Sequence, residues 1–314
     1  MLDFARTHEL LETSDNILIL SHRNPDPDTV GSASALGFYL QSKNINFTLA
    51  CPNSIPENLT FLNSATFYSD SNLLDLNKFD LIMTVDCGDL TQTGISDQII
   101  ENRQAFTLIN IDHHQTNPHF GDINLVEAAG ATAEIILKFL KHKNALLDKN
   151  ISTALLAGIV TDTSYFTNAG TTEQSMAFAS TLLNSNADFK SIIRSTWKKN
   201  SPEALKVWGK ILSQLHFNEK HKIVTAVISP EDDISSDVYE GLANFLTTLY
   251  EANIIFVIRE NDGIIKCSLR TIKDQIDVSQ LAKLFGGGGH RKAAGFSIRG
   301  NLIKTDNGWR VRTT

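Results

Sequence analysis

The sequence predicts an α/β fold in which a parallel β-sheet carries helices on both faces. Four short apolar segments, residues 16–21, 46–50, 80–85 and 106–111, have the length and composition of buried strands. Helix-like stretches lie between them, and strands that alternate with helices are typical of such a sheet. At 314 residues the chain exceeds one average domain, so we expect two domains.

Helical periodicity marks the stretches between and after these strands. Residues 29–42 carry small residues on one side, and residues 133–143 place four large apolar residues at helical spacing. A further helix is expected to end at Asp162, with Asn150 or Ser152 as its N-terminal cap. These helices would cover the sheet of the first domain.

The pattern changes in the second half of the chain. Two further helices are expected, the second of them polar and interrupted at Pro202, and after them short strands dominate. A turn signal, Asn261-Asp262-Gly263, joins two of these strands into a hairpin. We therefore expect a first domain over residues 1–186, a helical linker over 187–218 and a smaller α/β domain over 219–314.

Charge is distributed unevenly between these parts. Residues 259–314 contain eleven Lys and Arg against five Asp and Glu, a net charge of +6, whereas the whole chain carries −7 and residues 1–258 carry −13. An acidic first part fits a metal-holding domain, and a basic end fits the binding of an anion. The overall acidity argues against a non-specific binder of long duplex nucleic acid, which needs a broad basic face.

Composition also bears on the cellular environment. Cys51, Cys87 and Cys267 are odd in number and widely spaced, which disfavours a disulfide framework and fits a reducing cytoplasm. No run approaches 18 consecutive apolar residues, and the N-terminus does not resemble a signal peptide. We expect a cytoplasmic protein with no membrane segment, and both a monomer and a homodimer remain open.

Four apolar segments of the first domain run into side chains that bind metal ions. Ligands of open parallel sheets bind beyond the C-terminal ends of the strands, so these side chains are expected to converge on one polar site. Asp and His without Cys suit hard or borderline divalent ions. The side chains are His22 with Asp26 and Asp28, then Asp86, then Asp112-His113-His114, and finally Asp162.

The motifs, taken in order, resemble those of the DHH phosphoesterase family. Gly287-Gly288-Gly289-His290 with Ala293-Ala294-Gly295 is similar to the signature of the family's C-terminal substrate domain. Within the family, the length and this domain look most like the NrnA-type enzymes that act on nanoRNA and on 3′-phosphoadenosine-5′-phosphate. The first-domain motifs are His22-Arg23-Asn24-Pro25-Asp26-Pro27-Asp28 with Gly31-Ser32, Asp86, Asp112-His113-His114 with Asn117, and Gly158-Ile159-Val160-Thr161-Asp162-Thr163.

The resemblance implies a catalytic centre with two divalent ions, for which mixed Asp and His ligands favour Mn²⁺. Asp86 would bridge the ions, Asp112 would fix a histidine tautomer, and His114 would face the substrate phosphate. One ion would be held by His22, Asp26 and Asp86, and the other by Asp28, Asp86, His113 and Asp162.

The resemblance also implies a substrate site in the second domain, with a cleft between the domains. Arg270, in Cys267-Ser268-Leu269-Arg270, would contact a phosphate, and Gly288, Gly289 and His290 would hold the substrate end. The chain departs from the family at Ser164, because NrnA-type proteins often have glycine after the Asp-Thr pair. That departure concerns the local turn rather than the metal ligand.

The sequence thus predicts a hydrolase for very short RNA and for 3′-phosphoadenosine-5′-phosphate. A phosphodiesterase for linear or cyclic dinucleotides and a RecJ-like single-strand exonuclease are alternatives. A third alternative is an RNA-binding module without activity, against which the intact set of six metal ligands argues.

Overall fold

The computed structural model describes residues 2–62, 68–168, 170–197, 202–229, 232, 236–289, 291–305 and 308–312. The chain divides into two compact units, Met1–Trp197 and Lys198–Thr314. The division falls inside the segment predicted to be a helical linker. Helix α7 (Phe189–Thr196) belongs to the first unit, and helix α8 (Pro202–Leu212) belongs to the second.

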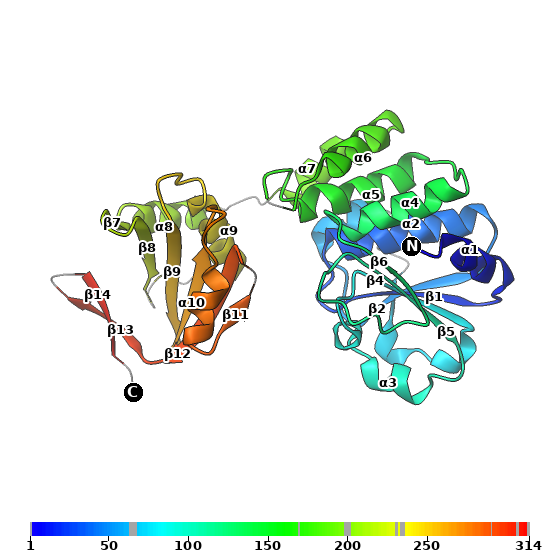
Figure 1. Ribbon diagram of the computed structural model, residues 1–314, viewed down its shortest axis with the longest axis horizontal. Coiled ribbons are helices and arrows are strands. Elements are labelled where there is room, and N and C mark those ends of the chain that lie inside the picture. The colour runs from blue at the N-terminus through cyan, green and yellow to red at the C-terminus, as the bar shows by residue number, and fades with distance from the viewer. Residues whose placement is uncertain are drawn as a thin grey trace. The chain divides into compact units, whose positions relative to one another are not determined.

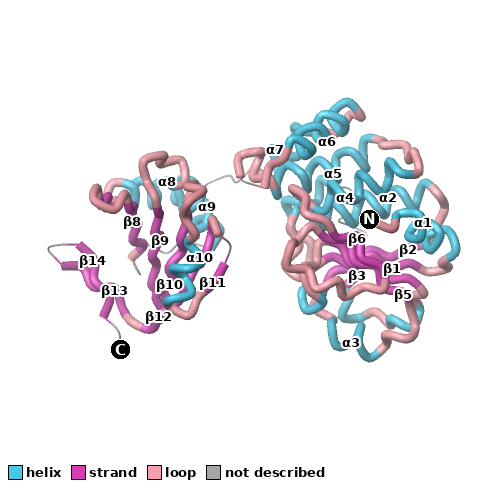
Figure 2. The backbone as a smooth tube through the Cα atoms, in the orientation of Figure 1, coloured by secondary structure: helices cyan, strands magenta, loops and turns pink. Residues whose placement is uncertain are grey.

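The first unit contains a six-stranded parallel sheet in the order β3-β2-β1-β4-β5-β6 (Figures 1 and 2). The four strands that the sequence predicts form its centre, and two short edge strands, β3 and β6, were not expected. The strands are β1 (Ile17–Ser21), β2 (Phe47–Cys51), β3 (Tyr68–Asp70), β4 (Leu81–Val85), β5 (Thr107–Asp112) and β6 (Ile123–Val126).

Helices cover both faces of this sheet (Figure 1). Helices α2, α4 and α5 pack on one face, while α3 and short 3-10 turns cover the other. The helices are α1 (Phe4–Thr13), α2 (Pro27–Ser42), α3 (Ser96–Glu101), α4 (Thr132–His142), α5 (Lys149–Asp162), α6 (Glu173–Asn184) and α7. The turns are η1 (Glu57–Leu62), η3 (Ser71–Leu73), η4 (Leu76–Lys78) and η5 (Leu90–Thr93).

A side chain caps the N-terminus of α1, α2, α5, α6 and α7, whereas α3 and α4 have no side-chain cap. Helix α5 is capped by Asp148, whose carboxylate accepts from the Ile151 N–H, so the prediction of Asn150 or Ser152 was wrong. Both of those residues lie inside the helix.

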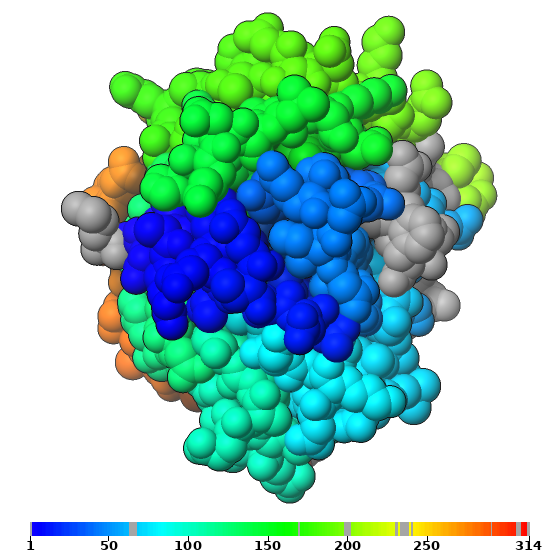
Figure 3. All heavy atoms as spheres, turned by 90° about the vertical axis from the view of Figure 1, so that its right-hand side faces the viewer, coloured from blue at the N-terminus to red at the C-terminus, as the bar shows by residue number. Residues whose placement is uncertain are grey.

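At the N-terminus of the chain, α1 lies on the surface beside α4 (Figure 3), where the rings of Phe4 and His8 contact Phe139.

Small residues allow α2 and α5 to approach closely near the ends that reach the candidate site. A Cβ atom on Gly31 would lie 2.3 Å from the Ala154 carbonyl oxygen. A Cβ atom on Gly158 would lie 2.3 Å from Oδ1 of Asp28. The small side predicted for residues 29–42 therefore serves the contact between these helices, and Gly158 leaves room for an acidic side chain.

The second unit contains a mixed six-stranded sheet in the order β11-β12-β10-β9-β8-β7, in which only the β8–β9 pair is parallel. Helices α8 and α9 (Ser236–Leu246) pack on one face, and α10 (Val278–Leu284) packs on the other. The strands are β7 (His216–Asn218), β8 (Ile223–Ile228), β9 (Ile254–Asn261), β10 (Ile264–Arg270), β11 (Gly288–Gly289) and β12 (Ala293–Arg299), with a separate pair β13 (Asn301–Thr305) and β14 (Gly308–Arg312).

Two further observations bear on the sequence predictions. Cys51, Cys87 and Cys267 are all free and buried. Within the described part of the chain, no helix has the length and apolar character needed to cross a membrane.

Candidate metal centre

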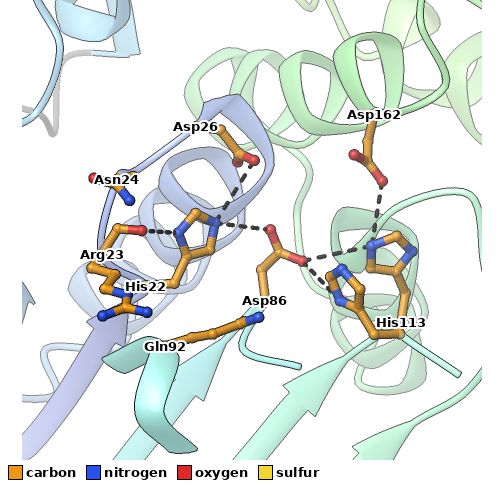
Figure 4. Close-up of a pocket in the computed structure, with 9 residues that line it drawn as sticks. His22, Arg23, Asn24, Asp26, Asp86, Gln92, His113 and Asp162 are labelled. Atoms are coloured by element: carbon orange, nitrogen blue, oxygen red, sulfur yellow. Dashed lines mark hydrogen bonds and ion pairs between the residues drawn. The ribbon is translucent and has the colours of Figure 1, made fainter. Parts of the chain in front are cut away.

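The predicted metal ligands lie together at one end of the first unit, where β1, β4, β5 and α5 end (Figure 4). In three groups of side chains, the candidate ligand atoms of each group lie within 4.8 Å of one another. The structure thus brings together all six residues predicted to hold metal. The groups are His22, Asp26 and Asp86; Asp28, His113 and Asp162; and Asp86, His113 and His114.

Asp86 occupies the centre of this arrangement. Its Oδ2 lies 3.5 Å from Nε2 of His22, and its Oδ1 lies 3.6 Å from Nε2 of His113 (Figure 4). The hydroxyl of Thr132 donates to the same Oδ1 at 2.9 Å. Asp86 has a positive φ of 59°, an uncommon conformation that aspartate tolerates better than most residues and that is found at functional sites. The residue therefore turns its two oxygens toward two different ligand groups.

Two of the histidines present the same ring nitrogen to the centre. Nδ1 of His22 lies 2.8 Å from the Arg23 carbonyl oxygen, and Nδ1 of His113 lies 3.0 Å from the Ala129 carbonyl oxygen. A carbonyl can only accept, so Nδ1 carries a proton, and Nε2 faces the centre as an acceptor when the ring is neutral. A backbone partner of this kind commonly orients a metal-binding histidine.

The distances within the centre fit ligands of shared ions. Nε2 of His113 lies 3.3 Å from Oδ2 of Asp162, and Nε2 of His22 lies 3.7 Å from Oδ2 of Asp26. Two atoms that each bind one ion at about 2.1 Å lie roughly 3–3.5 Å apart. Facing acceptors repel each other unless a cation or a proton lies between them, so the donor set fits divalent cations.

The burial of acidic groups also fits a site for divalent cations. Burial raises the pKa of Asp28 well above its usual range, and the charges of Asp86 and Asp162 raise it further. Burial also raises the pKa of Asp162 to about 6, although the charge of His113 opposes this shift. Carboxylates crowded in this way are stabilised in their charged form when cations neutralise them.

Asp28 is held in place by the first turn of α4. Its oxygens accept from the backbone N–H groups of Thr132, at 2.7 Å, and of Ala133, at 3.0 Å. The N-terminus of a helix stabilises a negative charge through these unpaired N–H groups and the helix dipole. Asp28 consequently joins α2, which carries it, to α4 and to the metal centre.

Asp112 orients His114 rather than either of the other histidines. Its Oδ1 lies 2.8 Å from Nδ1 of His114, while Asn117 donates to its Oδ2 at 2.6 Å. The bond to Asp112 raises the pKa of His114 to about 9, which favours the protonated ring. With Nδ1 engaged, the Nε2 proton of His114 is available to a group in the pocket.

Four residues of the site were missed by the sequence prediction. Arg23, Asn24 and Gln92 line the same pocket as the candidate ligands, and Thr132 contacts Asp86 as described above. Arg23 and Asn24 stand within the first motif, which was read only for its acids and histidine. No local sequence motif marks Gln92 or Thr132 as a site residue. Only the fold brings them to the site.

The departure at Ser164 has a visible consequence for the backbone. Ser164, Tyr165 and Phe166 all have positive φ values, between 50° and 64°, immediately after Asp162-Thr163. Glycine adopts this conformation without penalty, whereas other residues are strained by it. The side-chain amide of Asn168 donates to the Asp162 carbonyl oxygen at 2.8 Å, which ties the strained turn to the end of α5. The chain therefore forms this turn of positive φ values without a glycine.

The predicted substrate residues lie in the second unit. Arg270 ends β10, where its Nη1 donates to the Leu269 carbonyl oxygen and its Nε approaches Asn244 at 3.5 Å. Gly288 and Gly289 form β11 and are exposed. Gly289 has a φ of 136°, and a Cβ there would lie 2.6 Å from the backbone of Ala294. His290 lies outside the described residues.

Comparison with known proteins matches both units to family models. The model for the N-terminal domain of the DHH family matches residues 16–159, and the DHHA1 domain model matches residues 220–306. The first match covers every candidate ligand except Asp162, which lies three residues beyond its end. The second match covers Arg270, Gly288 and Gly289.

Individual relatives extend over most of the chain. The bifunctional oligoribonuclease and PAP phosphatase NrnA of Thermus thermophilus is 29% identical over 90% of this chain and 84% of its own length. A probable NrnA of Streptococcus mutans is 27% identical, over 91% and 90%. The cyclic-di-AMP phosphodiesterase GdpP of Bacillus subtilis is 23% identical over 93% of this chain, but over only 46% of GdpP.

A solved structure shares the fold. An exopolyphosphatase-related protein from Bacteroides fragilis superposes with a TM-score of 0.83 at 24% identity, covering 93% of this chain and 90% of that protein. The relatives named above are hydrolases of phosphate esters, and the candidate metal ligands of this chain form three neighbouring groups. With a DHH N-terminal domain followed by a DHHA1 domain, the chain belongs to the DHH family of phosphoesterases.

Proposed function

We propose that this protein hydrolyses very short oligoribonucleotides to nucleoside monophosphates, and 3′-phosphoadenosine-5′-phosphate to AMP, with two divalent ions, preferably Mn²⁺. The observation that carries the proposal is the position of Asp86, whose two oxygens face two separate ligand groups. The NrnA relatives, similar over nine-tenths of the chain, support this choice of substrates.

The residues of the centre divide the work of phosphoester hydrolysis. Two divalent ions in such a site neutralise the charge of the scissile phosphate and activate water. His22, Asp26 and Asp86 would hold one ion, and Asp28, His113 and Asp162, with Asp86, would hold the other. His114, kept protonated by Asp112, would donate from Nε2 to the phosphate or to the leaving oxygen.

A cyclic or linear dinucleotide phosphodiesterase is the second candidate. It is favoured by the similarity to GdpP, which extends over 93% of this chain. An RNA-binding module without activity is disfavoured, because binding alone requires neither six ligand side chains nor their close approach. A RecJ-like exonuclease predicts a different dependence on substrate length, which is measurable.

The decisive experiment measures kcat/KM on 5′-labelled RNA from two to ten nucleotides long. We expect kcat/KM to fall as RNA lengthens, since residues 1–258 carry a net charge of −13 and offer a long strand no attractive track. Duplex RNA should be a poor substrate. Constant salt is needed throughout, because phosphate contacts depend on ionic strength.

The same series separates the alternatives. 3′-Phosphoadenosine-5′-phosphate and cyclic di-AMP are assayed beside the RNA, with product identified at each time point. Rates that rise with RNA length would favour the exonuclease. Turnover of cyclic di-AMP alone would favour the dinucleotide phosphodiesterase, and no turnover with any divalent metal would favour the binding module.

Arg270 provides a separate prediction for the second unit. We propose that its guanidinium contacts a substrate phosphate, so Arg270→Ala should raise KM while the metal content stays unchanged. Loss of one charge-assisted phosphate contact costs about 1.5–3 kcal/mol, or roughly 10- to 150-fold in kcat/KM. Steady-state kinetics on a dinucleotide, with metal analysis of the purified variant, measures both quantities.

A matched variant removes an arginine elsewhere in the same unit. Arg299 is exposed at the end of β12 and has no ion pair recorded within the described residues, so Arg299→Ala should leave KM within about twofold of the original value, as for most surface changes. If Arg270→Ala strips the metal, or if both variants raise KM equally, the proposed contact is wrong.

A further inference from the structure

The pocket at the metal centre has two chemically different sides. Asp86 lies between His22 and His113, and Asp162 faces His113, whereas Arg23 and Asn24 lie beside His22 and Gln92 extends below Asp86 (Figure 4). In that view Arg23 and Asn24 lie on the far side of the His22 ring from His113. None of these three polar residues belongs to the candidate metal ligands, so each is free to contact another polar group of a substrate.

The guanidinium of Arg23 has no acidic partner within the described residues, although it lines an acid-rich pocket. Its backbone, by contrast, is fixed at both ends. The Arg23 N–H donates to the Gln92 carbonyl oxygen at 2.7 Å, and the Arg23 carbonyl accepts from Nδ1 of His22 at 2.8 Å. A fixed backbone beside a metal-ligand candidate carries an exposed, unpaired cation.

Gln92 adds a donor of known orientation. Its Oε1 accepts from the Gly88 N–H at 2.7 Å. Because a backbone N–H can only donate, this bond places the carbonyl oxygen toward Gly88 and leaves the Nε2 amide group for the pocket. No hydrogen bond of Nε2 is recorded among the described residues. The side-chain groups that Arg23 and Gln92 leave free in the pocket are therefore both donors.

We propose that Arg23 and Gln92 bind a terminal phosphate of the substrate, so that short nucleotides with a free 5′- or 3′-phosphate are preferred over dinucleotides without one. The inference rests on the proposed function and names a substrate class within it. A phosphomonoester carries nearly two negative charges at pH 7 and several acceptor oxygens. Arginine pairs with such a group in a bidentate manner, and the Gln92 amide adds a further donor.

Electrostatics explains why this residue pair is needed. The pocket is lined by Asp26, Asp86 and Asp162, and any ions held at the centre would be occupied by the scissile phosphate. A second phosphate would meet uncompensated acidic charge unless a cation received it. Arg23 is the only arginine or lysine that lines the pocket among the described residues. A cyclic dinucleotide has no phosphomonoester and leaves this place unfilled.

The test compares three dinucleotides that differ only in their ends: ApA, pApA with a 5′-phosphate, and ApAp with a 3′-phosphate. In Arg23→Ala, kcat/KM should fall about 10- to 100-fold on at least one phosphorylated form and change little on ApA. The phosphorylated form whose kcat/KM falls identifies whether Arg23 contacts the 5′- or the 3′-phosphate. Arg23→Lys should recover part of the loss, because lysine keeps the charge but not the paired geometry.

Control measurements separate this inference from the proposed function. Arg6→Ala removes an exposed arginine of α1 that pairs with Glu9 and does not line the pocket, so it should change no ratio. Equal loss on all three dinucleotides, or no loss on any, would overturn the assignment of Arg23. If the wild-type protein hydrolyses none of them, the proposed function fails instead. Calorimetric binding of AMP against adenosine, which needs no turnover, then decides whether Arg23 recognises the phosphate.

Discussion

Asp86→Ala is expected to abolish hydrolysis and to remove most divalent-metal binding. No other side chain in the centre turns one oxygen toward His22 and the other toward His113, so both proposed ion positions lose a ligand at once. Residues that merely support a metal ligand cost about 10- to 100-fold when changed, and a shared ligand should cost more than that. Calorimetric titration with Mn²⁺ and activity after exhaustive chelation measure the two effects.

Two further variants separate the loss of this ligand's charge from misfolding and from the loss of any surface carboxylate. Asp86→Asn keeps the shape and tolerates the positive φ of this position, so a folded protein with lost metal binding isolates the role of the charge. Asp97→Ala removes an exposed carboxylate of α3 in the same unit and should retain both properties. Full activity of chelated protein, or undiminished metal binding by Asp86→Asn, would contradict the two-ion proposal.

The sequence predicted the centre of the fold better than its edges. β1, β4 and β5 are buried on both faces, and such strands produce unbroken apolar runs that are easily recognised. β3 and β6 are three- and four-residue edge strands with partly exposed residues, and neither has a comparable pattern. For this reason, the ends of β1 and β4, which His22 and Asp86 follow, could be predicted from the sequence.

The dual role of the acidic residues could not be predicted from the sequence alone. Asp26 accepts from the N–H groups of Asp28 and Thr29 as the cap of α2, and it also belongs to a metal-ligand group. An acid after a strand fits either role, and only the approach of His22 and Asp86 places this capping residue in a candidate ligand group. The contact between Asp28 and the N-terminus of α4 joins residues more than one hundred positions apart, and no local pattern reveals it.

The residues that line the pocket without being metal ligands show the same limit. Gln92 reaches the pocket from η5, and Thr132 reaches Asp86 from the first turn of α4. Each is an ordinary polar residue in an ordinary sequence context. Their positions depend on the order of the strands in the sheet, which composition and periodicity do not determine.

Gly158→Ala is expected to weaken both the first unit and the metal centre, although glycine has no side chain to contribute to either. The added Cβ would lie 2.3 Å from Oδ1 of Asp28 and 2.9 Å from Cβ of Ala133, so the contact between α2, α4 and α5 must open. Overpacking of a tight core costs about 1–3 kcal/mol. A displacement of Asp28 by about 1 Å can reduce activity about 100-fold. Denaturant unfolding, Mn²⁺ titration and kcat/KM measure the three consequences.

Gly209 supplies the opposite case in the second unit. It lies exposed in α8, and no heavy atom lies within 4 Å of a Cβ built there, so Gly209→Ala should leave activity unchanged and stabilise its helix by up to about 1 kcal/mol. If Gly158→Ala destabilises the first unit but binds Mn²⁺ normally, helix packing and ligand position are independent. If instead Gly158→Ala binds Mn²⁺ weakly while the unit stays stable, glycine is needed at position 158 to keep Asp28 in place. The close approach of α2 and α5 would then be part of the metal centre.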